Sequence, residues 1–152
     1  QLDPSYKNLT WYGRGPHESY WDRKAGARVG LYSGTIAAQY VNYGKPQENG
    51  NKSDVRWAVV TKNNGQGLQI ISGVSDYLNV SAHNYSLENL TTAKHPFDLK
   101  DAPYVTVNID HQQMGLGGDD SWNPRTHKEF LLDGKVYEYS YILKPVSGGD
   151  EK

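Results

Sequence analysis

The chain has 152 residues, with 16 lysine and arginine and 17 aspartate and glutamate side chains, so its formal net charge is −1. The charges are interspersed, which argues against a nucleic-acid-binding protein, since these need a basic stripe. No apolar run approaches the roughly 18 residues of a membrane span. The absence of cysteine excludes disulfides, thiolate metal sites and a cysteine nucleophile. The length fits one domain with its own core.

The first notable segment in chain order is WYGRGPHESYWDR, residues 11–23, in which glycines and a proline separate charged and aromatic residues. Its two arginines, Arg14 and Arg23, could form forked pairs with Glu18 or Asp22. We expect such pairs to hold together a structural loop. A second polar turn, PQENG at residues 46–50, contains one carboxylate.

Two-residue alternation dominates the rest of the chain and predicts half-buried strands. It runs through residues 55–59, 105–110 and 137–143, and it places Val55, Trp57 and Val59 on one face of a single strand. Two hairpins are predicted, because Asn-Gly at 64–65 and Asp-Gly at 133–134 lie between alternating runs and favour tight turns with positive φ. The expected architecture is an antiparallel all-β fold.

One segment, residues 86–93, has a helical pattern. Ser86 is a capping residue and the two leucines are spaced three apart. The pattern ends before His95-Pro96, because the residue before a proline disfavours helix. We therefore expect one short helix of one or two turns in an otherwise β chain.

The segment MGLGGDDSWNP, residues 114–124, combines glycines, two acids and a tryptophan. Asp119 and Asp120 could suggest a glycosidase pair, but neighbours in an extended chain point to opposite faces. We expect them instead to bond backbone N–H groups and anchor the turn. The glycines, including Gly117 and Gly118, should shape the loop, and they match neither a dinucleotide loop nor a P-loop.

A calcium site in the same segment fits poorly. Asp119, Ser121 and Asn123 alternate as in an EF-hand loop, but Pro124 and Phe130 occupy the positions that require Gly and Glu. No metal site is therefore predicted. Trp122 is the strongest candidate for binding, because loops carry function disproportionately. A structural plug against the end of the sheet is the alternative role for this tryptophan.

Three ordered stretches, WYGRGPHESYWDR, PQENGNKSDVRW and MGLGGDDSWNP, resemble the C-terminal, small-chain domain of glycoside hydrolase family 2 β-galactosidases. The resemblance runs from about Leu9 to Pro145. It implies a galactose-mutarotase-like β-sandwich, or supersandwich, of which this chain is the C-terminal part. Residues 1–146 would form this partial domain and residues 147–152 a flexible tail. A cut sandwich leaves open edges, which invite pairing with another chain and thus a homo-oligomer.

The resemblance also implies a division of labour. In the family, the catalytic glutamates and the magnesium and sodium ligands lie on a separate barrel domain, so no catalytic residue and no cofactor is expected in this segment. The small-chain domain lends a loop to the active site, and Trp122 holds the position that contacts substrate. The expected partners are a β-galactoside or related sugar and the remaining domains of the parent enzyme.

Two other functions are open. The aromatic content suits a stand-alone carbohydrate-binding module, and fold analogy alone suggests an aldose 1-epimerase, for which His83, His111 and Glu48 are the available acid and base residues. The compartment is also open, since Asn-x-Ser/Thr sequons would indicate a secreted eukaryotic chain, whereas an Asn-rich bacterial chain, cytoplasmic or periplasmic, is favoured. The sequons lie at Asn8, Asn51, Asn79, Asn84 and Asn89.

Overall fold

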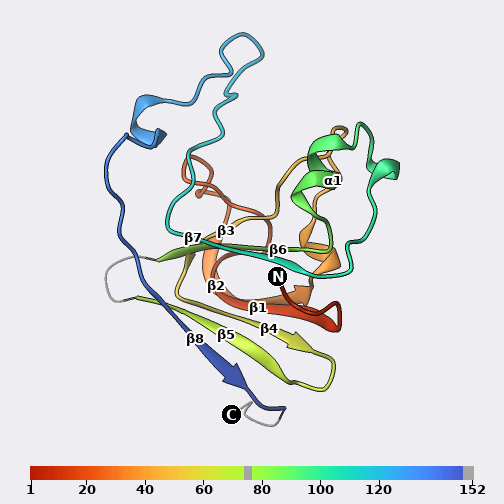
Figure 1. Ribbon diagram of the computed structural model, residues 1–152. Coiled ribbons are helices and arrows are strands. Elements are labelled where there is room, and N and C mark those ends of the chain that lie inside the picture. Colours follow the sequence, from red (N-terminus) through yellow and green to blue (C-terminus); the bar gives the residue numbers. More distant parts are fainter. Residues whose placement is uncertain (74–76, 149–152) are drawn as a thin grey trace.

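The computed structural model describes residues 1–73 and 77–148 of the chain. Over these residues eight strands form two antiparallel sheets, which lie as two layers (Figure 1). The helical elements in the same ranges are one six-residue α-helix and three short 3₁₀ turns. The predicted all-β antiparallel sandwich with one short helix is therefore confirmed.

The larger sheet has five strands in the order β2-β1-β4-β5-β8. Their bounds are β1 (Tyr6–Gly15), β2 (Arg28–Thr35), β4 (Trp57–Lys62), β5 (Gly67–Ser72) and β8 (Tyr141–Val146). The strand β1 lies between β2 and β4. The strand β8 returns from the far part of the chain to pair with β5, with Gly67 opposite Val146.

The smaller sheet has the order β3-β6-β7, with β3 (Lys52–Val55), β6 (Leu78–His83) and β7 (Thr106–Asp110). The alternation at residues 105–110 correctly predicts β7. Val105 is buried, and Val107 and Ile109 pack partly buried against the core. Near the start of the chain, Leu2 forms an isolated bridge with Val105.

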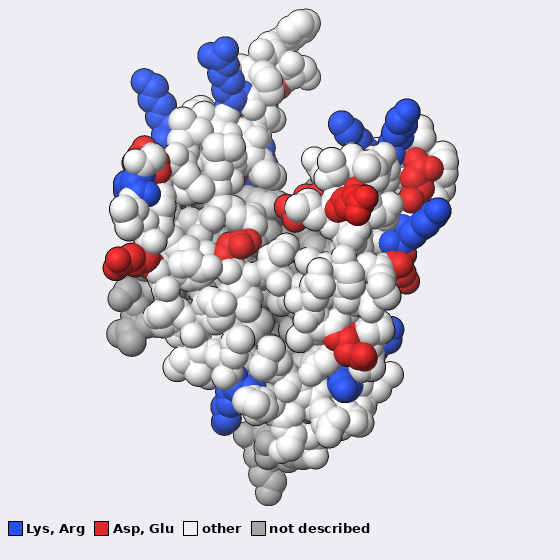
Figure 2. Space-filling model, in the orientation of Figure 1, with Lys and Arg blue, Asp and Glu red and all other residues white. Residues whose placement is uncertain are grey.

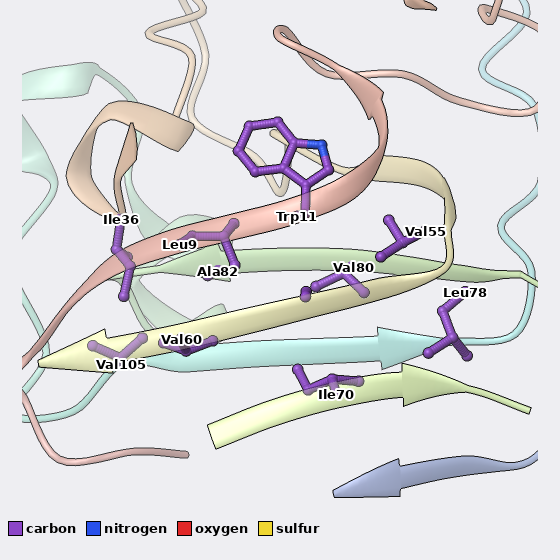
Figure 3. Close-up of a cluster of buried hydrophobic side chains, with 11 residues drawn as sticks. Leu9, Trp11, Ile36, Val55, Val60, Ile70, Leu78, Val80, Ala82 and Val105 are labelled. Carbon is purple, nitrogen blue, oxygen red and sulfur yellow. The ribbon is translucent and has the colours of Figure 1, made fainter. Parts of the chain in front are cut away.

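The core fills the space between the sheets (Figure 3). The larger sheet contributes Leu9, Trp11, Ala58, Val60 and Ile70, and the smaller sheet contributes Val55, Leu78, Val80 and Ala82. Both layers therefore bury one face against the other, as in a β-sandwich.

The strand predicted through Val55, Trp57 and Val59 is in fact two strands. The chain leaves β3 at Val55 and enters β4 at Trp57, so it changes sheets at Arg56. In β4 the fully buried residues are Ala58 and Val60, whereas Trp57 and Val59 line a groove on the outer face of the larger sheet. Because both faces of β4 carry apolar side chains, alternation alone could not identify the buried face.

The predicted Asn64-Gly65 hairpin is confirmed and joins β4 to β5. The Gly65 N–H donates to Lys62 O at 3.0 Å, and the Lys62 N–H donates to Gln66 O at 2.8 Å. Gly65 has φ +81°. This is a three-residue loop with one glycine in the left-handed region, rather than a two-residue turn with positive φ at both central positions.

The predicted Asp133-Gly134 hairpin is wrong. Residues 131–140 contain no strand, and the chain becomes extended in a sheet only in β8. Most of these side chains are exposed, and Tyr139 stacks on the His111 ring with centroids 5.4 Å apart. A turn dipeptide alone does not produce a hairpin, because an isolated two-stranded hairpin is only marginally stable unless its strands pack against other structure.

The predicted short helix is confirmed as α1 (Leu87–Thr92). The Ser86 side chain accepts a hydrogen bond from the Asn89 N–H at 3.1 Å, which is the expected N-cap. Further along the chain, Pro96–Asp98 forms a 3₁₀ turn. No helix in the described residues is long and apolar enough to cross a membrane. Of the predicted flexible tail, residues 149–152 lie outside the described residues.

Candidate functional site

Trp122 lies in the long connection between β7 and the short turn Lys128–Phe130. This connection projects away from the two sheets (Figure 1), and the space-filling view shows a hollow between it and the lobe that contains α1 (Figure 2). The Trp122 side chain is 94% exposed. Because it is so exposed, this tryptophan does not pack as a plug against the end of the sheet. Its indole instead offers a large apolar surface to solvent.

The backbone around Trp122 is held by the side chain of Asp120. One oxygen, Oδ1, accepts hydrogen bonds from the N–H groups of Trp122 at 2.7 Å and Asn123 at 2.6 Å. This is an Asx-type turn. Asp119 instead pairs with Nε2 of His127 at 2.5 Å, and this hydrogen bond raises the pKa of His127.

Two glycines below this turn adopt backbone conformations that other residues rarely take. Gly117 has φ +67° and Gly118 has φ +75°. A Cβ on Gly117 would lie 2.6 Å from the carbonyl oxygen of Pro124, on the returning part of the loop, whereas a Cβ on Gly118 would meet open space. Gly117 is therefore required by both conformation and packing, and Gly118 by conformation alone.

The base of the loop rests on the segment Trp21-Asp22-Arg23. The Gly117 N–H donates to Asp22 Oδ2 at 2.8 Å, and the Arg23 guanidinium donates to the Gly117 carbonyl. Burial opposes ionisation of Asp22, but hydrogen bonds from backbone N–H groups, Gly117 first, hold its pKa below the ordinary value. The Trp21 ring meets Phe130 edge-on at 5.9 Å.

An open pocket of about 220 Å³ lies beside this base. Its wall combines three aromatic rings with charged and amide side chains: Trp21, Lys24, Asp54, Tyr77, Asn79, His111, Gln112 and Gln113. Asp54 has φ +53° and is the single non-glycine residue with positive φ in the described ranges. Its carboxylate pairs with Arg14 at 2.5 Å and Lys24 at 2.6 Å.

A family defined by the β-galactosidase small chain matches residues 1–143. The chain belongs to the β-galactosidase small-chain family. The three sequence stretches that suggested this family therefore identified it correctly, and the match covers both sheets up to the first residues of β8.

Curated relatives of this small-chain segment are β-galactosidases. The chain is 42% identical over 146 residues to a β-galactosidase of Priestia megaterium, which covers 95% of the chain and 14% of that protein. It is 44% identical over 135 residues to one from Pseudoalteromonas haloplanktis and 45% identical over 132 residues to one from Alteromonas mediterranea. These matches cover 89% and 87% of the chain, and 12% of each relative. The small-chain segment thus spans about one eighth of the relatives' length.

The arginine pairs predicted within residues 11–23 of the small-chain segment are wrong. Arg14 pairs with Asp54 on β3, and Arg23 bonds to Gly117. Glu18 accepts hydrogen bonds from the hydroxyls of Tyr20 and Tyr43 and from the Gly50 N–H. These partners are 25 to 94 residues away, apart from Tyr20, so local spacing could not reveal them.

A buried polar cluster beneath Glu18 was not predicted. Lys52 is 2% exposed; its Nζ donates to Gly50 O at 3.0 Å and lies 5.1 Å from the centre of the Trp11 ring. Burial lowers the Lys52 pKa to about 8. Asn51 is also 2% exposed, so it cannot accept a glycan in the folded chain. Lys52 is the first residue of β3, and a lysine at that position gives no sequence signal for burial.

The residues considered for an epimerase are not brought together. His83 is buried at the end of β6 and contacts the Tyr40 ring edge-on at 6.0 Å. His111 lies beyond the opposite end of that strand, where its carbonyl accepts from Asn79 at 3.0 Å. Glu48 is exposed in a loop. The four residue steps from Asn79 to His83 span roughly 13 Å in a strand, too far for both histidines to flank one sugar ring.

The described residues also contain no group of three or more histidine, aspartate or glutamate side chains placed to hold a metal ion. The side chains of Asp119 and Asp120 face different partners, His127 and the loop backbone. What the projecting loop offers is therefore an aromatic surface on a fixed backbone.

Proposed function

We propose that this chain is a non-catalytic segment of a β-galactosidase and that Trp122 contacts the sugar at the edge of an active site on a separate barrel domain. The observation that carries this proposal is the 94% exposure of Trp122 on a backbone held by hydrogen bonds. An exposed indole is available to a ligand or another domain, and an ordered loop loses little entropy when it binds.

The chemistry of the contact follows from the indole. A galactoside has an apolar face of C–H groups, and a flat aromatic ring can cover it by dispersion and by removal of water. Such a contact gives affinity and orientation but transfers no proton. The bond-breaking steps need two carboxyl groups on either side of the glycosidic bond, and we assign these, with the family's magnesium and sodium, to the remaining domains.

The small-chain segment also offers surfaces for those domains. The strands β2 and β8 are the outer strands of the larger sheet, and Leu31 on β2 and Ile142 on β8 are 65% and 59% exposed. Open strand edges with apolar side chains favour pairing with further chain. We propose that the rest of the parent enzyme, or a second copy, covers them.

Replacement of Trp122 by alanine in an intact β-galactosidase carrying this chain tests the proposal. Loss of a stacking contact worth about 1–2 kcal/mol should raise KM for nitrophenyl β-galactoside about 5- to 30-fold, and Trp122→Phe should retain part of the affinity. The matched control is Phe97→Ala, which removes an aromatic ring that is 83% exposed on the other lobe. Unchanged kinetics for Trp122→Ala would refute the role.

One observation favours a second function, a carbohydrate-binding module. The pocket beside the loop base has Trp21 and Tyr77 in its wall together with Gln112 and Gln113, a combination suited to hydroxyl groups and apolar sugar faces. Calorimetric titration of the isolated chain with galactose and lactose distinguishes the two functions. Strong binding that Trp122→Ala does not weaken would support the module, and no binding would support the dependent segment.

A further inference from the structure

We propose that Asp22 and Arg23 are positioning residues that hold Trp122 in place by clamping the peptide groups on both sides of Gly117. This inference rests on the proposed role of Trp122. Asp22 Oδ2 accepts from the Gly117 N–H at 2.8 Å, and Arg23 donates to the Gly117 carbonyl. One residue of the loop is therefore bonded through both its N–H and its C=O to a segment about 95 positions earlier in the chain.

The sequence of the loop is suited to this clamp. A Cβ on Gly115 would lie 2.8 Å from the Asp22 carboxylate and 2.7 Å from Phe130, and a Cβ on Gly117 would lie 2.6 Å from the carbonyl oxygen of Pro124. Side chains at either glycine would thus force the outgoing and returning parts of the loop apart. The glycines allow both parts to close on Asp22 and Arg23.

Further contacts hold the two parts of the loop together at the same level. The Gly115 N–H donates to Phe130 O at 2.9 Å, and the Thr126 hydroxyl donates to Gly115 O at 2.9 Å. The Trp21 ring supports Phe130 from the side. The segment Trp21-Asp22-Arg23 therefore contacts both the outgoing and the returning chain, which makes it the point where the loop is fixed to the sandwich.

Beyond this point the loop has no support from the sandwich. Residues 118–125 are all exposed. The side-chain hydrogen bonds found there stay within the loop: the Trp122 and Asn123 N–H groups donate to Asp120, and His127 pairs with Asp119. The tip is thus a unit with its own turn, and its direction is set at Gly117. Because misplacement by about 1 Å can cost up to about a hundredfold in rate, loss of the clamp should impair the Trp122 contact.

The test compares Asp22→Ala and Arg23→Met with Trp122→Ala in an intact β-galactosidase carrying this chain. Each clamp variant should raise KM for nitrophenyl β-galactoside about three- to tenfold, with kcat changed less, and Asp22→Asn, which keeps an acceptor oxygen, should restore part of the affinity. The matched controls are Asp133→Ala and Arg125→Met, whose exposed side chains form no hydrogen bond in the described structure. If Trp122→Ala raises KM but the folded clamp variants keep the wild-type KM, the inference is overturned.

Two further measurements distinguish an effect of Asp22 and Arg23 on the position of Trp122 from a general loss of stability. They also distinguish failure of this inference from failure of the proposed function. In the Trp122→Ala background, the clamp substitutions should raise KM no further, whereas an additive increase would show that they act elsewhere and would refute the inference. Fluorotryptophan NMR reports the position of Trp122 without substrate. Its resonance should shift and broaden in Asp22→Ala, and an unchanged resonance would contradict the clamp whatever the kinetics show.

Discussion

Acidification should destabilise the chain through one buried histidine. His83 is 1% exposed, and neither ring nitrogen has a hydrogen-bond partner in the described structure. Burial, together with the charge of Lys52, lowers its pKa from 6.5 to about 4. The unfolded chain therefore takes up this proton as the pH falls through about 6.5, while the folded chain takes it up only near pH 4.

The size and sign of the effect follow from these two values. Each pKa unit corresponds to about 1.4 kcal/mol, so the interval from 6.5 to about 4 makes a difference of about 3 kcal/mol. Protonation favours the unfolded state throughout this interval. Stability from neutral His83 is complete above pH 6.5 and is lost progressively as the pH falls to 4.

Urea unfolding between pH 8 and pH 4 measures this loss in the wild-type chain and in His83→Leu, whose side chain is close in size and does not titrate. The wild type should lose about 3 kcal/mol more than the variant over this range. Carboxylates with lowered pKa, such as Asp54, are common to both chains, so the difference isolates His83. Parallel stability curves would refute the argument.

Two other substitutions probe the charges around this core. Burial lowers the Lys52 pKa from 10.5 to about 8, so the wild type should gain stability relative to Lys52→Met as the pH rises from 8 to 10.5, and a constant difference in urea unfolding would contradict this. Asp54→Asn removes the charge that pairs with Arg14 and Lys24. It should reduce the free energy of unfolding by about 1–3 kcal/mol, because a partly buried guanidinium loses its anion. The control substitution Asp133→Asn, at an exposed position, should change the free energy of unfolding by less than about 0.5 kcal/mol. Equal melting temperatures for Asp54→Asn and Asp133→Asn would show that the pairing of Asp54 with Arg14 and Lys24 adds no stability.

Sequence patterns predicted those elements whose determinants are local. Ser86 caps α1 through a bond to a residue three positions later, and Gly65 closes the β4–β5 turn with Lys62. In both cases the residues that decide the conformation are neighbours in the chain. The family was also evident from sequence, because three long stretches occur in the same order.

Elements that depend on distant partners were not predictable in the same way. Asp133-Gly134 has the same turn chemistry as Asn64-Gly65, but the residues on either side of it do not pair in a sheet. Arg23 was expected to pair within its own segment and instead holds Gly117. Trp122 could be proposed as a binding residue from sequence, whereas its exposure and its support by Asp22 depend on the fold.

The pairing of β8 with β5 has a consequence for synthesis of the chain. Residues 73–140 separate the two strands, so the edge of β5 remains open on the ribosome until β8 has emerged. At about 5–20 residues per second this delay lasts roughly 4–15 s. During that time Ile70 and Ile71 lie on an unpaired edge, which is the state in which strands associate with the wrong neighbour. Chaperone dependence and misassembly in cells should therefore respond most strongly to changes in β8.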